Sequence, residues 1–155
     1  MKSFEETLNT VLVDTFKSIR RYEEKVLRSL CDVSITLGEM HLIESIKKLG
    51  EQATISAIAL YQGISLPSVT VGVKKLESKA LIAKKRKKDG RSSMIELTEK
   101  GEEIAEKHAS FHQRLSIDIG KGLNITDKES LLVAMTRINE FFNQTSFSEK
   151  ETMKI

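Results

Sequence analysis

Two histidines in the last third of the chain have the spacing of metal ligands. The chain contains three histidines in all, and His108 and His112 are four positions apart. Apolar residues such as Ile104 and Phe111 recur around them at helical spacing, which predicts a helix. Side chains four positions apart lie on one face of a helix, where two imidazoles can bind the same metal ion. The pair is therefore a candidate metal site. His41 is the third histidine of the chain.

A catalytic zinc ion is one use for such histidines. Three histidines and a glutamate can hold zinc with one coordination position open for an activated water molecule. The sequence has no glycine-rich phosphate loop, no nucleophile motif and no second carboxylate placed for acid–base catalysis. We therefore expect a binding protein and no enzyme, with a zinc-dependent enzyme that uses His41, His108 and His112 as the alternative.

Residues 54–98 have the pattern of a winged helix-turn-helix, in which two short helices precede a hairpin. Thr54 can cap the first helix, and Gly63 ends it. Ser65 can cap the second helix, which runs to about Lys79. The turn between the two helices is short, as the motif requires.

The second helix has a polar face opposite its apolar stripe. Hydroxyl groups on this face can hydrogen-bond base edges or phosphates, and Val71 can contact a thymine methyl group. Gly72 would allow a close approach of the backbone to DNA. An ordinary solvated helix face has a similar composition, so this helix alone leaves the choice open. The residues expected to contact DNA from this helix are Ser65, Ser68, Thr70, Val71, Lys74 and Lys75.

A basic hairpin follows and favours a nucleic acid as the partner. The extended runs 81–88 and 94–98 flank Asp89 and Gly90, a strong signal for a hairpin turn. Residues 74–93 contain nine Lys or Arg and two acidic residues, a local charge of +7, while the rest of the chain carries −4 of the total of +3. Charge segregated in this way is typical of a protein that binds a polyanion.

The remaining apolar patterns predict helices at residues 4–30, at 38–49, from 99 to about 120, and from Thr126 onward. Thr36 can cap the helix at 38–49. We expect Thr126 to cap the last helix, with Glu129 three residues later completing a capping box. The first helix and the last two have apolar stripes that a winged-helix core of this size cannot bury. We therefore expect these helices to pack against a second copy of the chain.

The length of 155 residues is enough for one domain with an added dimerisation element. We expect one domain that spans residues 1–155, with dimerisation helices at 1–33 and 99–145 and the winged helix-turn-helix at 36–98. The fold class is thus mainly α with a small β wing. No apolar run is long enough for a membrane span, no signal segment is recognisable, and there is one cysteine. We therefore expect a soluble cytoplasmic protein.

The order of elements, together with segments 68–79 and 89–101, resembles the MarR family of dimeric bacterial transcription regulators. The resemblance spans nearly the whole chain, and it implies a DNA-binding protein that acts as a repressor on a pseudo-palindromic operator. It also implies that Arg91 enters the minor groove while Asp89 holds it in place. Ala80 departs from the family, which usually has glycine there. The hairpin residues expected to contact DNA are Lys87, Lys88, Asp89, Arg91 and Ser92.

The resemblance also implies an effector site between the dimerisation helices and the winged helix. Glu24, His41, His108 and His112 resemble the ligand set of the zinc-sensing repressors in the family, so Zn²⁺ is the cofactor to consider. The surroundings of His41 and of residues 108–112 equally resemble the fatty-acid-synthesis repressors, which sense acyl groups on acyl carrier protein. The sequence does not decide between zinc and an acyl group as the effector. For Cys31, a structural role is preferred over redox sensing, because few cations are near it in the sequence.

Overall fold

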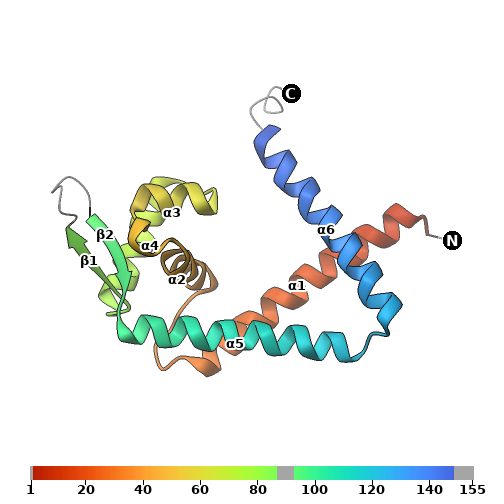
Figure 1. The fold of residues 1–155 in the computed structure, drawn as a ribbon, viewed down its shortest axis with the longest axis horizontal. Coiled ribbons are helices and arrows are strands. Elements are labelled where there is room, and N and C mark those ends of the chain that lie inside the picture. The colour runs from red at the N-terminus through yellow and green to blue at the C-terminus, as the bar shows by residue number, and fades with distance from the viewer. Residues whose placement is uncertain (1, 87–92, 149–155) are drawn as a thin grey trace. The chain divides into compact units, whose positions relative to one another are not determined.

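The computed structural model describes residues 2–86 and 93–148 and is mainly helical, with one small antiparallel sheet (Figure 1). It divides into two compact units, Met1–Ser110 and Phe111–Ile155. The elements in chain order are α1 (Phe4–Leu30), α2 (Leu37–Leu49), the 3-10 turn η1 (Gly50–Gln52), α3 (Ile55–Gln62), α4 (Leu66–Ser78), β1 (Ile82–Arg86), β2 (Ser93–Leu97), α5 (Glu99–Lys121) and α6 (Ile125–Ser148). The predicted mainly α fold with a small β wing is confirmed.

Helices α3 and α4 form the predicted helix-turn-helix. The Thr54 hydroxyl accepts a hydrogen bond from the Ala57 amide at 3.1 Å and begins α3. Gly63 ends α3 in the left-handed region, at φ +65°. The Ser65 hydroxyl then caps α4. The two helices are bent by 116° at this break, within the range of about 90–120° that is typical of the motif.

The core of the first unit lies between α2, α4 and the two strands. Its largest fully buried side chains come from α2 to α5: Met40, Ile43, Ile46, Ile58, Val69, Val73, Leu76, Leu81, Ile95 and His108. The Ile95 amide donates to the Ala53 carbonyl at 2.8 Å, which joins β2 to the end of η1. Burial of the apolar members of this set packs one face of α4 into the core and leaves the opposite face in solvent.

Strands β1 and β2 form an antiparallel pair in which Ile82 lies opposite Leu97 and Arg86 lies opposite Ser93. The pairing agrees with the predicted hairpin. Ile82 and Ile95 face the core. In the rest of β1, Ala83 is half-buried and residues 84–86 are exposed. The Asp89-Gly90 turn and the predicted contacts Lys87, Lys88, Asp89, Arg91 and Ser92 lie outside the described residues.

The end of α4 has an alanine where a glycine is expected. Ala80 lies at φ +56° and is the only described non-glycine residue with positive φ. Its amide donates to the Glu77 carbonyl at 2.9 Å, and the Leu81 amide donates to the Leu76 carbonyl at 3.0 Å. These two bonds form a Schellman motif, completed by the buried side chains of Leu76 and Leu81. The left-handed cap is therefore formed without glycine.

The second unit contains the end of α5 and α6, and the predicted start of α6 is wrong. Asn124, not Thr126, caps this helix: its side-chain oxygen accepts from the Asp127 amide at 2.9 Å. Asparagine is at least as good an N-cap as threonine, so α6 begins at Ile125. Among the described residues no single helix is long and apolar enough to cross a membrane, and the bent pair α3–α4 passes that test on length and composition alone.

Candidate nucleic-acid interface and effector site

The exposed face of α4 carries the residues that the sequence predicts at the DNA. Val69, Val73 and Leu76 are fully buried, which turns the other side of the helix outward. Ser65, Ser68, Val71, Lys74 and Lys75 are exposed, and Thr70 is half-buried. Structure and prediction thus agree on which face of α4 is accessible.

Three of the hydroxyl groups on this face are already engaged in hydrogen bonds. The Thr70 hydroxyl donates to the Leu66 carbonyl at 2.8 Å. The hydroxyls of Ser65 and Ser68 lie 2.8 Å apart. A hydroxyl can still accept while it donates, so these groups can meet amino groups or water at the DNA surface. The cations and Val71 are accessible as they stand.

Gly72 does not serve a close approach to DNA, as its sequence context suggested. It is buried, and a Cβ atom at this position would collide with the Leu42 side chain. The absence of a side chain therefore permits close packing of α4 on α2. The interpretation was wrong because the sequence does not show which helix lies beneath this position.

Three lysines of the basic segment are neutralised by ion pairs. Lys79 pairs with Glu39 at 2.8 Å, Lys84 with Glu77 at 2.7 Å and Lys85 with Glu96 at 2.7 Å. By contrast, Lys74, Lys75 and Arg86 form no ion pair with another described residue. The positive charge available to a polyanion on the described residues is therefore centred on the exposed face of α4 and the end of β1.

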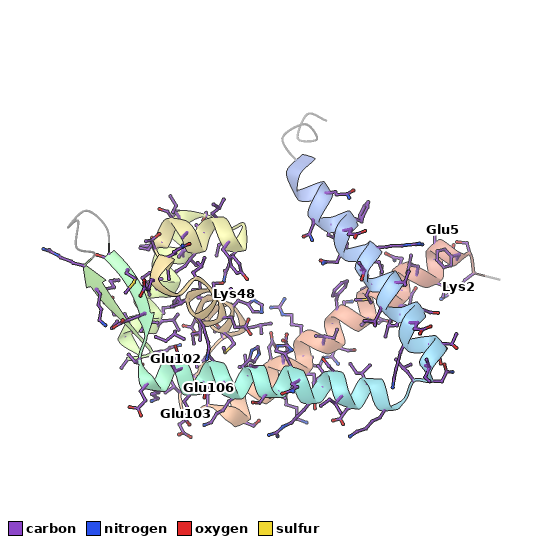
Figure 2. All side chains as sticks on the ribbon, in the orientation of Figure 1. Lys2, Glu5, Lys48, Glu102, Glu103 and Glu106 are labelled. Carbon is purple, nitrogen blue, oxygen red and sulfur yellow. The ribbon has the colours of Figure 1, made fainter. Side chains whose placement is uncertain are left out.

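The first turns of α5 are fastened to α2. Figure 2 labels Glu102, Glu103 and Glu106 on these turns. Lys47 on α2 pairs with Glu102 at 2.8 Å and lies 3.7 Å from Glu106. The hydrogen bond from Lys47 to Glu102 is the largest cause that raises the pKa of Lys47. Both side chains of the closer pair are exposed by more than 40%, so these ion pairs add little to the buried apolar contacts of α5.

His108 is buried between carboxylates from α2 and α1. Its side chain is 1% exposed, with Nδ1 2.7 Å from a Glu44 oxygen and Nε2 3.9 Å from a Glu23 oxygen. A carboxylate on one ring nitrogen orients the imidazole and determines which nitrogen carries the proton. Sequence reasoning missed both Glu23 and Glu44. The helical spacing of Glu44 from His41 on α2 was the available signal.

Glu24 and His41, two further residues of the predicted effector site, have other neighbours. Glu24 is partly exposed and accepts from Arg20 Nε at 3.1 Å. His41 is exposed and lines a hollow of about 370 Å³ together with Tyr61 and Ile64. Within the part of the chain that the structure describes, no group of three or more metal-ligating side chains that lie close together includes His41 or Glu24.

His112 belongs to the second unit, four residues after His108 on α5. Its ring lies 5.1 Å from that of Phe111. The alternative of a zinc-dependent enzyme requires His41 beside both other histidines, and the described residues do not form that set.

Cys31 is half-buried at the end of α1. Burial raises the pKa of its thiol, and this effect exceeds the opposing influence of Lys107. A redox-sensing thiol needs a stabilised thiolate. The environment of Cys31 therefore favours the structural role.

Comparisons with known proteins indicate the family. Residues 25–108, more than half of the chain, match the family described as transcriptional regulator SarA/Rot. No curated protein matches the sequence. Among solved structures, Streptococcus pneumoniae FabT in complex with DNA is 26% identical with a TM-score of 0.86, covering 91% of this chain and 99% of that chain.

Two further structures share the fold at lower identity. The Staphylococcus aureus MepR–DNA complex is 18% identical with a TM-score of 0.72, covering 90% of this chain and 99% of that chain. The MarR family transcription regulator SP03579 is 14% identical with a TM-score of 0.79, covering 94% and 93%. The chain therefore belongs to the SarA/Rot family of transcriptional regulators and has the winged helix-turn-helix fold of the MarR type.

Proposed function

We propose that the chain binds double-stranded DNA as a homodimer, through the exposed face of α4 and the hairpin, and that it represses transcription. The observation that carries the proposal is the division of α4 into two faces. One face is fully buried in the core, and the other presents Ser68, Val71, Lys74 and Lys75. The structure of FabT with DNA supports this use of the fold.

The two kinds of residue on this face have different tasks. Lys74 and Lys75 would neutralise phosphates, which gives affinity without sequence preference. Ser68 and Val71 would read base edges, since a hydroxyl can bond to several bases and an isopropyl group fits a thymine methyl. The hairpin residues, Arg91 above all, would add contacts in the minor groove.

The apolar face of α1 supports the homodimer. Large side chains such as Phe4, Val11 and Phe16 are 55–73% exposed on this helix. Helix α6 in the second unit also exposes Leu132, Phe141 and Phe142 by more than half. Apolar surface of this extent on a helix is typical of an interface. In a two-fold dimer the two recognition helices would enter successive major grooves about 34 Å apart.

Binding to the DNA upstream of the gene, measured over a range of salt concentrations, tests the proposal. Lys75→Met should reduce the slope of log K against log salt by about one unit, because one phosphate contact is lost. Val71→Ala should instead weaken binding to the preferred sequence and leave the slope unchanged. Lys128→Met, on exposed α6, is the matched control and should behave as wild type.

Equal binding to every duplex, or a Lys75→Met slope identical to that of wild type, would contradict the proposed interface. Sedimentation that finds only a 17.5 kDa species at micromolar concentration would contradict the homodimer.

We also propose that an effector, zinc or an acyl group, binds beside Glu23 and His108. The support is the orientation of the His108 ring, since Glu44 holds Nδ1 and turns Nε2 toward the Glu23 carboxylate. Histidines that bind a metal through one ring nitrogen commonly donate the N–H of the other to a carboxylate in this way. His108→Ala should abolish the response of DNA binding to the effector. If zinc binds and regulates equally well without His108, the site is wrong.

A further inference from the structure

We propose that Lys79, at the C-terminal end of α4, is a positioning residue for DNA binding and not a phosphate contact. Its ammonium group would fasten the recognition helix to residues 31–36, the segment that joins α1 to α2. The inference rests on the proposed DNA-binding function. Lys79 would thus have a different role from Lys74 and Lys75, although all three belong to the same basic segment of the sequence.

The hydrogen bonds of Lys79 occupy all of its donors. Nζ donates to the Ser34 carbonyl at 2.7 Å and to the two carboxylate oxygens of Glu39 at 2.8 Å each. An ammonium group has three N–H donors and no acceptor. A phosphate could reach Lys79 only by displacing one of these partners.

Glu39 is itself held firmly in place. Its carboxylate accepts from the Thr36 amide at 2.8 Å and from the Thr36 hydroxyl at 3.1 Å. The Glu39 amide in turn donates to the Thr36 hydroxyl at 3.2 Å, which completes a capping box at the start of α2. The side chain of Glu39 is 5% exposed, against 25% for Lys79. The anchor is therefore a fixed, desolvated carboxylate.

The exposed pair between Lys84 and Glu77 provides the contrast. Its side chains are 35% and 44% exposed, and it joins α4 to the neighbouring strand β1. A pair in such an exposed setting contributes little to structure. The Lys79 network instead joins segments that are 40 and 45 residues apart in the sequence.

The consequence for function follows from what the network connects. The segment 31–36 continues directly from α1, the helix whose exposed apolar face we assign to the dimer. A shift at the end of α1 would pull on Ser34 and Thr36 and, through Glu39 and Lys79, on the end of α4. The position of the end of α4 is thus coupled to α1, the helix that we assign to the dimer interface.

The test measures binding to a duplex that the wild-type protein selects from a random-sequence library, over a range of salt concentrations. Lys79→Met should weaken binding about tenfold, a usual coupling within one ion-pair network, with the salt slope unchanged. Lys75→Met should lower the slope by about one unit, and Lys84→Met should match the wild type. A Lys79→Met slope lowered by one unit, or an affinity equal to that of wild type, would overturn the proposal.

Glu39→Gln provides a second, independent variant, because the amide still accepts from Thr36 while it loses the charge. It should weaken binding by a factor similar to that of Lys79→Met. The double variant should bind no more weakly than the weaker single variant, since both break one network; additive losses would refute the network. Failure of the wild-type protein to select any duplex would instead reject the DNA-binding function, and this role with it.

Discussion

Replacing Ala80 with glycine should make the protein more stable. Ala80 lies at φ +56°, where the Cβ of an L-residue is crowded by its own backbone. Hydrogen bonds on both sides of Ala80 hold its backbone in the left-handed conformation. The Schellman hydrogen bonds of α4 precede it, and its carbonyl accepts from the Thr98 hydroxyl at 2.8 Å. Thr98 also donates its amide to the Leu81 carbonyl at 3.0 Å. The chain therefore cannot relax by leaving the left-handed region.

The expected gain is the difference between two opposing terms. The left-handed conformation costs an L-residue roughly 1–2 kcal/mol, which glycine avoids. Glycine loses about 0.5–1 kcal/mol more conformational entropy on folding than alanine. The free energy of unfolding should therefore rise by about 0.5–1 kcal/mol, which for a chain of this size raises Tm by roughly 1–4 °C. No contact is lost, because the Ala80 side chain is exposed.

Urea denaturation measures this difference, and one fixed protein concentration keeps the contribution of dimer dissociation equal for all variants. Ala109→Gly is the matched control: Ala109 is an exposed residue inside α5, and its φ is not positive. The control should lose about 0.5–1 kcal/mol, the usual cost of glycine within a helix. If Ala80→Gly were destabilised to the same degree, the reasoning from the backbone angle would be wrong.

Two further predictions concern the same junction and its neighbour. Gly101→Ala should lower the free energy of unfolding by about 1–3 kcal/mol, because a Cβ there would collide with the Leu81 carbonyl oxygen; Gly38→Ala, which meets nothing within 4 Å, is the urea-denaturation control. For Glu39, burial opposes ionisation, but hydrogen bonds from Lys79 and Thr36 outweigh it and hold the pKa of the carboxyl below its ordinary value of 4.5. The ionised Glu39 carboxylate therefore stabilises the fold fully above this value, and the stabilisation is lost as pH falls through the lowered pKa. Wild type should therefore exceed Glu39→Gln in unfolding free energy at pH 7, and a gap that failed to shrink in acid would disprove this linkage.

The helix boundaries of the winged helix-turn-helix could be predicted because they depend on local chemistry. The caps at Thr36, Thr54 and Ser65, and the left-handed stop at Gly63, each involve residues within five positions of one another. The error at α6 has the same origin. Asn124 and Thr126 are both good caps, so the choice between them depends on a difference too small to read from sequence.

The candidate sites were less predictable because they depend on contacts between distant segments. A shift of one position around α1 exchanges Glu24, which pairs with Arg20, for Glu23, which faces His108. Such a shift turns the side chain by about 100°. The partner of His108 follows from how α1 meets α5, which no local pattern encodes.

The ion pairs also change the salt dependence expected for DNA binding. Nine basic residues between positions 74 and 93 would give a slope of about −8 per protomer if each displaced one counterion. Lys79, Lys84 and Lys85 are already paired with glutamates, and each must give up its partner, or share its charge with it, to contact a phosphate. If each of the other six basic residues of this segment displaced one counterion, the slope would reach at most about −5 per protomer. Affinities measured over a range of salt concentrations should give a slope within this limit. A steeper slope would mean that DNA separates these ion pairs. Lys79 should be the last of the three lysines to leave its glutamate, because the Glu39 carboxylate is buried.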